Sequence, residues 1–124
     1  MNRQHTILEK LRTSSRPIVL FGASMAGRKI YCELKRKALG NELCFCDNYK
    51  HGIEPITQGR IITPEELTAH YADATVCVCI ASPSYREEVC RQLKGMGFSS
   101  EQILEYPQLA EAVLAEHGGE LTWT

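Results

Sequence analysis

Long apolar runs and an excess of charge of one sign are both missing from this sequence of 124 residues. No apolar run approaches the ~20 residues that a helix needs to cross a bilayer, so we expect no membrane span. The formal net charge is only −1, whereas proteins that bind nucleic acids or anionic membranes rest on a basic excess. Residues 1–6 are polar and lack the apolar centre of a secretion signal. We therefore expect a cytoplasmic protein that binds neither nucleic acid nor membranes.

The sequence also lacks the cysteine and histidine spacing of a metal site. None of its 6 cysteines forms a C-x-x-C pair, and no histidine stands beside them. Cys44, Cys46, Cys77 and Cys79 fall inside apolar runs, where free cysteine behaves as a small hydrophobic residue. Because no secretion signal precedes them, we expect reduced thiols and no bound metal.

Recognisable catalytic sets are missing as well. The sequence contains no G-x-S-x-G elbow, no Ser/His/Asp set and no Ser-Tyr-x-x-x-Lys pattern. Tyr31 and Lys35 have the spacing of a Tyr-x-x-x-Lys pair, but they fall on an expected crossover helix where that pair has no catalytic precedent. Among the histidines, only His51 follows a strand end closely enough to reach a ligand. We therefore expect no complete catalytic site within this chain and name no catalytic residue.

What the sequence does contain is a regular alternation of strand and helix signals. Its length and its 44% of apolar residues are typical of one soluble domain, which we place at residues 1–124. Runs that are apolar at nearly every position are typical of parallel strands covered on both faces. We predict an α/β, three-layer, Rossmann-like fold with a parallel five-stranded sheet in the order 3-2-1-4-5. The expected strands are residues 18–21, 43–46, 59–62, 74–81 and 103–105.

Capping signals mark two helix starts in the second half of the chain. Thr63 and Glu66 flank Pro64, which is the pattern of a capping box with proline at the first helical position. Ser84 and Glu87 have the spacing of a second capping box. We expect these boxes to open two of the helices, with others at residues 3–12, after residue 27 and from residue 107.

The C-terminal residues 120–124 alternate between apolar and polar side chains. Leu121 and Trp123 are the apolar members, and this period of two is typical of a half-buried strand. The alternation predicts a tail that adds to a sheet edge or packs against a second copy in a homodimer. A tail without fixed structure and with an exposed tryptophan is the alternative.

A glycine-rich loop joins the first expected strand to its helix. It matches G-x-G-x-x-G, the dinucleotide-binding pattern, except that Ser24 replaces the middle glycine. Free backbone N–H groups at the start of the helix would face an anion, and Arg28 in the first turn would meet a phosphate or lie exposed. Ser24 blocks the closest approach of a pyrophosphate but offers a hydroxyl donor. The loop thus predicts binding residues at Gly22, Ala23, Ser24, Met25, Ala26, Gly27 and Arg28.

Two further segments follow strand ends and complete the expected site. Asp47 and Asn48 follow the second strand, where an acid in this fold accepts hydrogen bonds from a ribose diol. Ala81, Ser82 and Pro83 follow the fourth strand, across the crevice from the glycine loop. The alternative is that Asp47 only caps a loop and that the serines only cap the next helix.

These segments resemble one group of proteins over roughly residues 16–104. The motifs are FGASMAGR at 21–28, FCDN at 45–48, IITPEEL at 61–67, and IASP at 80–83 followed by YREEV at 85–89. They look like the small Rossmann domain of bacterial polysaccharide-biosynthesis proteins, often labelled CoA-binding-like, as in nucleotide-sugar dehydratases and epimerases. The resemblance implies a bound NAD or nucleotide-sugar, with the chemistry performed by another domain.

The sequence therefore indicates a nucleotide-binding module without its own catalytic site, linked to sugar or polysaccharide biosynthesis. Its expected partners are a nucleotide-containing small molecule and either a second copy or a catalytic domain. Two alternatives stay open at this point: a minimal NAD-dependent oxidoreductase or epimerase completed by a partner, and a docking domain that has lost its ligand. Fold alone does not decide among them.

Overall fold

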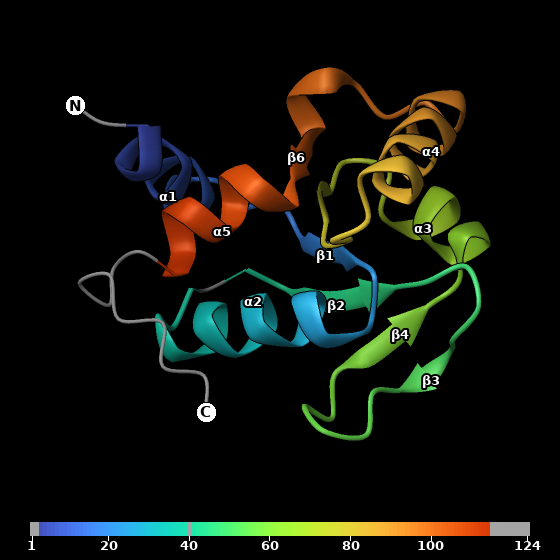
Figure 1. The fold of residues 1–124 in the computed structure, drawn as a ribbon, viewed down its shortest axis with the longest axis horizontal. Coiled ribbons are helices and arrows are strands. Elements are labelled where there is room, and N and C mark those ends of the chain that lie inside the picture. The colour runs from blue at the N-terminus through green and yellow to red at the C-terminus, as the bar shows by residue number, and fades with distance from the viewer. Residues whose placement is uncertain (1–2, 40, 115–124) are drawn as a thin grey trace.

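A computed structural model describes residues 3–39 and 41–114 of the chain (Figure 1). Strands and helices alternate along most of this length, as the apolar runs predicted. The strands are β1 (Ile18–Phe21), β2 (Leu43–Cys46), β3 (Gly52–Ile53), β4 (Arg60–Ile62), β5 (Thr75–Val78) and β6 (Ile103–Glu105). The helices are α1 (Arg3–Thr13), α2 (Met25–Arg36), α3 (Pro64–His70), α4 (Pro83–Gly95) and α5 (Tyr106–Leu114), with a short 3₁₀ turn at Ser100–Gln102.

The strands form one mixed sheet in the order β3-β4-β2-β1-β5-β6. Every neighbouring pair is parallel except β3 and β4, which are antiparallel. The prediction of five parallel strands in the order 3-2-1-4-5 is therefore wrong in strand count and in the order of the whole sheet. The added strand is Gly52–Ile53, whose residues are both exposed, so no buried run marks it in the sequence. The fold is α/β with a mostly parallel sheet.

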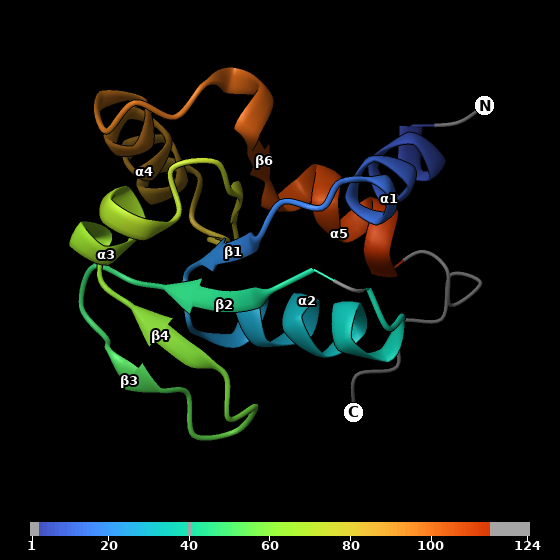
Figure 2. The ribbon, with the colours of Figure 1, turned by 180° about the vertical axis from the view of Figure 1, so that it is seen from behind.

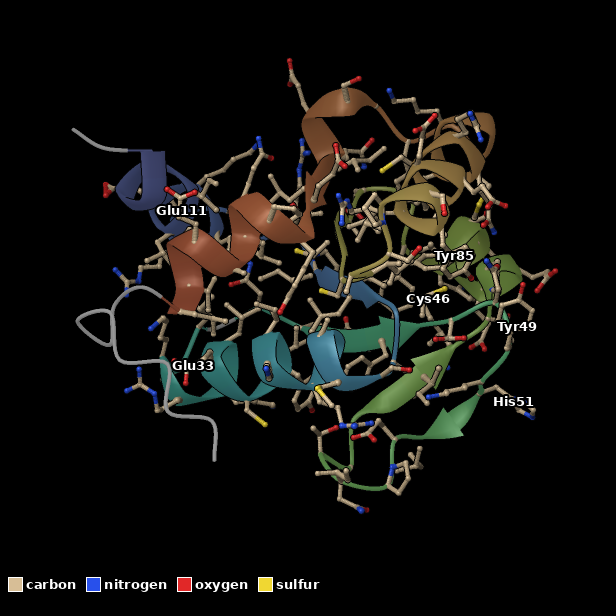
Figure 3. The ribbon with its side chains drawn as sticks, in the orientation of Figure 1. Glu33, Cys46, Tyr49, His51, Tyr85 and Glu111 are labelled. Atoms are coloured by element: carbon tan, nitrogen blue, oxygen red, sulfur yellow. The ribbon has the colours of Figure 1, made fainter. Side chains whose placement is uncertain are left out.

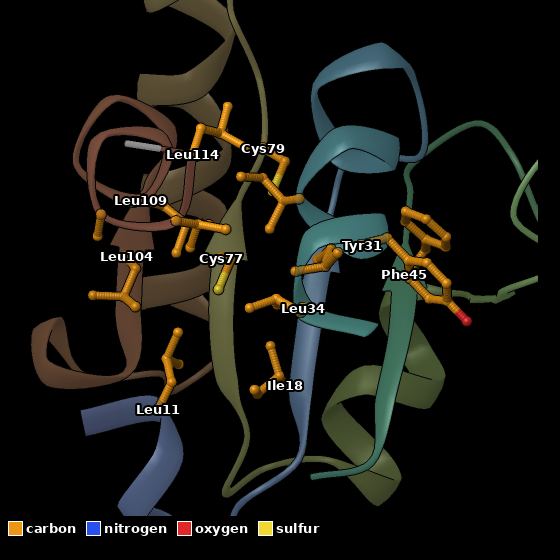
Figure 4. Close-up of a cluster of buried hydrophobic side chains, with 14 of the residues drawn as sticks. Leu11, Ile18, Tyr31, Leu34, Phe45, Cys77, Cys79, Leu104, Leu109 and Leu114 are labelled. Carbon is orange, nitrogen blue, oxygen red and sulfur yellow. The ribbon is translucent and has the colours of Figure 1, made fainter. Parts of the chain in front are cut away.

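Helices cover both faces of the sheet, which makes three layers (Figures 1 and 2). Along β1, Ile18 and Leu20 point to the cluster formed with α1, α2 and α5, part of which is drawn in Figure 4. Val19 and Phe21 point to the opposite cluster, formed with α3 and α4. All four side chains are buried, which explains why β1 is apolar at every position rather than alternating.

One of the two predicted capping boxes is present. The Thr63 hydroxyl accepts a hydrogen bond from the Glu66 N–H at 3.1 Å, and the Glu66 carboxylate accepts one from the Thr63 N–H at 3.3 Å. The second prediction is wrong, because α4 begins at Pro83 with Ser82 at the N-cap position and no side-chain capping bond. Proline has a fixed φ and no N–H to satisfy, so it opens the helix earlier than the Ser84 pattern indicates.

Within residues 3–39 and 41–114, no helix is both long and apolar enough to cross a membrane. The expected strand at residues 120–124 lies outside the described residues, so the tail and the homodimer it would form stay predictions. Cys44, Cys46, Cys77 and Cys79 are buried free thiols on strands or directly after them, as expected for small hydrophobic side chains.

Candidate functional site

Gly22 and Gly27 hold the loop between β1 and α2 in close contact with the sheet. Gly22 has a φ of +118°, and a Cβ added to it would lie 2.6 Å from the carbonyl oxygen of Cys79. A Cβ on Gly27 would lie 1.9 Å from the carbonyl oxygen of Gly22. Both positions therefore require glycine for the turn and for the close approach of the helix, as the fingerprint predicts.

Ser24 is the N-cap residue of α2, but its side chain does not cap the helix. Its hydroxyl instead accepts a hydrogen bond from the ammonium of Lys50 at 2.8 Å, and the same ammonium donates to the carbonyl oxygen of Ala23 at 3.2 Å. The first turn of α2 contains no acidic residue. The start of this helix thus combines free N–H groups with a lysine side chain, and both favour an anion.

Asp47 joins the glycine loop to the loop that follows β2. Its Oδ2 accepts a hydrogen bond from the Ala23 N–H at 2.9 Å. Its Oδ1 accepts hydrogen bonds from the N–H groups of Tyr49 at 2.9 Å and Lys50 at 3.2 Å. A carboxylate has about four lone-pair positions, so little of its capacity is left for a ribose. Asp47 holds the loops, and its role toward a ribose diol stays a prediction.

Asn48 lies in the same loop but faces α4. Its side-chain amide exchanges two hydrogen bonds with the amide of Gln92, at 3.0 and 2.9 Å, and donates to the Tyr85 hydroxyl at 3.1 Å. Asn48 therefore fixes Tyr85 and ties the end of β2 to the start of α4. It does not itself line the cavity described next.

A cavity of about 330 Å³ lies at the carboxyl ends of β1 and β5. These two strands are neighbours in the sheet, and the chain order reverses between them. In open α/β sheets this reversal creates the crevice in which ligands bind. Half of the expected site residues line it, namely Gly22, Ser24, Met25, Ala26, Asp47 and Ala81. The other half do not line it, namely Ala23, Gly27, Arg28, Asn48, Ser82 and Pro83.

Five lining residues were not predicted as site residues. Tyr49 and Tyr85 form one wall, with ring centroids 6.4 Å apart and an angle of 35° between the ring planes. Figure 3 shows both side chains at the same end of the molecule, beyond Cys46. Lys50 lies in the loop after β2 and its ammonium reaches the start of α2, whereas Cys79 and Ile80 follow β5. Tyr85 lies on α4, so nothing local in the sequence places it beside the loop that follows β2.

Arg28 points away from the cavity. Its guanidinium lies 3.4 Å from the Glu54 carboxylate, which is only 2% exposed. Burial raises the pKa of Glu54, but hydrogen bonds from the Thr57 N–H and hydroxyl more than offset this and hold the pKa below its usual value. The pair fixes the turn between β3 and β4 against α2, and the expected contact of Arg28 with a phosphate stays a prediction.

Burial raises the pKa values of two ionisable groups that line the cavity, Tyr85 and Cys79. Burial raises the pKa of the Tyr85 phenol, so its hydroxyl stays protonated at neutral pH. Burial also raises the pKa of the Cys79 thiol well above its usual value, which makes it a poor nucleophile. The residues that line the cavity provide a cation at Lys50, a hydroxyl at Ser24 and the aromatic faces of Tyr49 and Tyr85.

A second, more open hollow of about 720 Å³ lies beside α2 and the turn between β3 and β4. Tyr31, Lys35 and Ile56 are among its lining residues. The Lys35 ammonium lies 5.8 Å from the centroid of the Tyr31 ring, so its charge already has a partner. This hollow lies along the side of a helix rather than at strand ends, so the smaller cavity is the better candidate.

Groups of three or more residues arranged to hold a metal ion are absent from the part of the chain that the structure describes. Comparisons of the chain with protein-family models, with curated proteins and with solved structures find no match. The function is therefore inferred from the site itself.

Proposed function

We propose that this chain is a nucleotide-binding module that holds its ligand in the cavity at the carboxyl ends of β1 and β5. The observation that carries the proposal is the convergence of three segments on that cavity: the start of α2, the loop after β2 and the loop after β5. We also propose that the sheet is Rossmann-like, with β3 added as an antiparallel edge strand. The cavity then lies at the switch point of that sheet, where the strand order reverses. The ligand classes that fit are NAD and a nucleoside-diphosphate sugar.

The charge distribution of the cavity supports a phosphorylated ligand. The N–H groups of the first helical turn and the helix dipole both favour an anion at Ser24. Lys50 adds a full positive charge at the same place, 2.8 Å from the Ser24 hydroxyl. The serine in place of the middle glycine thus contributes a hydroxyl that a phosphate oxygen can use.

The module holds its ligand without transforming it. Tyr85 is protonated at neutral pH and Cys79 is buried, so neither serves as a base or a nucleophile. A partner or another domain would carry out the chemistry on the bound ligand. The resemblance of the motifs in residues 16–104 suggests that this chemistry belongs to sugar or polysaccharide biosynthesis.

Filling the cavity tests this function. Ala81 is exposed and lines the cavity, so Ala81→Trp places an indole in the ligand position without entering the core. Ala72 is also exposed but precedes β5, at the opposite edge of the sheet, and Ala72→Trp is the matched control. Thermal unfolding of each protein is measured with NAD, NADP, UDP-sugars, CoA and S-adenosylmethionine.

A ligand at a hundred times its Kd adds about 2.7 kcal/mol to the free energy of unfolding. We expect this stabilisation in the wild type and in Ala72→Trp, and its loss in Ala81→Trp. Equal stabilisation of Ala81→Trp, or no stabilisation of the wild type by any of these ligands, contradicts the proposed function.

A further inference from the structure

The ammonium of Lys50 lies where the protein itself provides little electrostatic stabilisation for a positive charge. Its ammonium lies at the N-terminal end of α2, where the helix dipole favours anions. Its acceptors are neutral oxygens, the hydroxyl of Ser24 at 2.8 Å and the carbonyl of Ala23 at 3.2 Å. Within residues 3–39 and 41–114, no carboxylate forms an ion pair with it. An anion beside Lys50 and Ser24 would therefore give the ammonium a charged acceptor.

Two tyrosines also line the cavity. Tyr85 is held rigidly, because its hydroxyl accepts a hydrogen bond from Asn48, which is itself locked to Gln92. Tyr49 is 81% exposed, and its ring is tilted by 35° from the ring of Tyr85. The ring centroids are 6.4 Å apart. These two aromatic rings form a stacking surface for a flat, aromatic group.

Large apolar side chains surround the entrance. Met25 is 64% exposed and Tyr49 is 81% exposed, and both line the cavity. Exposed apolar side chains that gather around a concave site are typical of a binding surface. Ile80 and Ala81, which follow β5, add apolar surface to the lining of the cavity.

The volume of the cavity limits the size of a ligand that can contact both Lys50 and the two tyrosines. Its volume of about 330 Å³ lies near the lower limit of the range of about 300–1,000 Å³ that small-molecule sites occupy. That space suits one nucleoside with its phosphate better than both halves of a dinucleotide.

We propose, resting on the nucleotide-binding function above, that the ligand is a nucleoside 5′-phosphate whose phosphate binds Lys50 and Ser24 and whose base stacks on Tyr85. In this arrangement the Lys50 ammonium exchanges the Ala23 carbonyl for a phosphate oxygen, which is the stronger acceptor because it is charged. Tyr49 closes over the other face of the base. A nucleoside diphosphate or its sugar ester satisfies the same contacts, with the additional groups extending out through the entrance.

Calorimetric titration of the full chain with AMP, UMP, adenosine, uridine and NAD tests this assignment. For the base that binds, we expect the nucleotide to bind at least about tenfold tighter than its nucleoside, because only the nucleotide carries the charged group. Lys50→Met should abolish this ratio and Lys50→Arg should keep most of it. Lys94→Met removes an exposed lysine at the C-terminal end of α4, away from Tyr85, and should leave the ratio unchanged.

Two substitutions of Tyr85 test whether the base stacks on its ring. Tyr85→Leu should weaken nucleotide and nucleoside by the same factor, roughly tenfold, whereas Tyr85→Phe should retain binding because it keeps the ring. Far-ultraviolet circular dichroism confirms that each variant is folded. An unchanged nucleotide-to-nucleoside ratio in Lys50→Met overturns the assignment.

Two further outcomes separate this assignment from the proposed function. If NAD binds and Ala81→Trp blocks it while AMP and UMP do not bind, only the present assignment fails. If neither these ligands nor UDP-sugars bind the wild type at all, both this assignment and the proposed function fail.

Discussion

The carboxylate of Asp47 accepts a hydrogen bond from the backbone N–H of Ala23 at 2.9 Å, so the loops that follow two adjacent strands are directly joined. The same side chain also accepts the N–H groups of Tyr49 and Lys50. Asp47, which itself lines the cavity, therefore connects the loops around it. In the proposed site, Lys50, whose backbone N–H is bound by Asp47, is the polar side chain that faces the ligand.

Asp47→Ala is expected to lower the free energy of unfolding by about 1–3 kcal/mol, because it leaves the N–H of Ala23, in a part-buried contact, without its acceptor and also frees two exposed N–H groups. Urea unfolding measures the difference. Asp73→Ala removes an exposed carboxylate elsewhere and should change stability by less than about 0.5 kcal/mol. Equal stabilities for the two variants would show that the Asp47 contacts do not hold the loops.

Gly27→Ala is expected to destabilise the fold by at least about 1–3 kcal/mol, since the new Cβ would overlap the Gly22 carbonyl oxygen. Gly95→Ala should have the opposite sign. A Cβ on Gly95 meets nothing within 4 Å, and alanine is favoured over glycine in a helix by about 0.5–1 kcal/mol. Denaturant midpoints compare both variants with the wild type. A neutral Gly27→Ala would refute the close approach of α2 to the loop.

Glu54→Gln is expected to flatten the dependence of stability on pH at acidic values. The pKa of Glu54 is lowered in the folded state, so the ionised carboxylate stabilises the fold above its unfolded pKa of about 4.3. This contribution declines as the pH falls from there through the folded pKa. Unfolding followed between neutral and strongly acidic pH should show a steeper decline for the wild type.

Glu87→Gln is the matched control for that experiment, because Glu87 forms an exposed ion pair with Arg91 at 3.2 Å. Exposed pairs contribute little, so its pH profile should follow the wild type. If Glu54→Gln also follows the wild type, the buried carboxylate is not ionised in the folded protein.

Tyr71→Phe tests a contact outside the site. The Tyr71 hydroxyl donates to the Glu42 carboxylate at 2.6 Å, and this hydrogen bond, together with burial, raises the pKa of Tyr71 to about 12. The protonated phenol therefore contributes stability below its unfolded pKa of about 10, which is lost as the pH rises toward 12. Ultraviolet titration should show one tyrosine that ionises later than the others, and Tyr71→Phe should remove it. A titration unchanged by the substitution contradicts the contact.

The parts of the fold that could be predicted are those whose signal lies in consecutive residues. β1 and β2 occupy the ranges 18–21 and 43–46 expected from their apolar runs, because strands buried on both faces are apolar throughout. The two-residue strand β3 carries no such signal, since Gly52 and Ile53 are both exposed. Its pairing with β4 depends on the turn held by Glu54, whose burial nothing in the local sequence indicates.

The candidate site also contains residues that could be predicted from the sequence and residues that could not. Gly22, Ser24 and Asp47 were found because the glycine pattern and the acid that follows stand at a fixed spacing along the chain. Lys50 and Tyr85 were missed because their contacts join distant residues: Lys50 reaches Ser24 across 26 positions, and Tyr85 meets Asn48 across 37. Those contacts exist only once the parallel strands bring three loops to one edge of the sheet.

The most direct test of the account is to map a bound nucleotide onto the amide spectrum of the ¹⁵N-labelled chain. Titration with UDP and with NAD is followed at every assigned N–H group. We predict saturable shifts confined to the carboxyl edge of the sheet, at Gly22, Ser24, Lys50, Ala81 and Tyr85, with none at Asn41 or Ala72 on the opposite edge. Shifts centred on the opposite edge, or no saturable shifts with either nucleotide, would contradict the claim that this cavity is a nucleotide site.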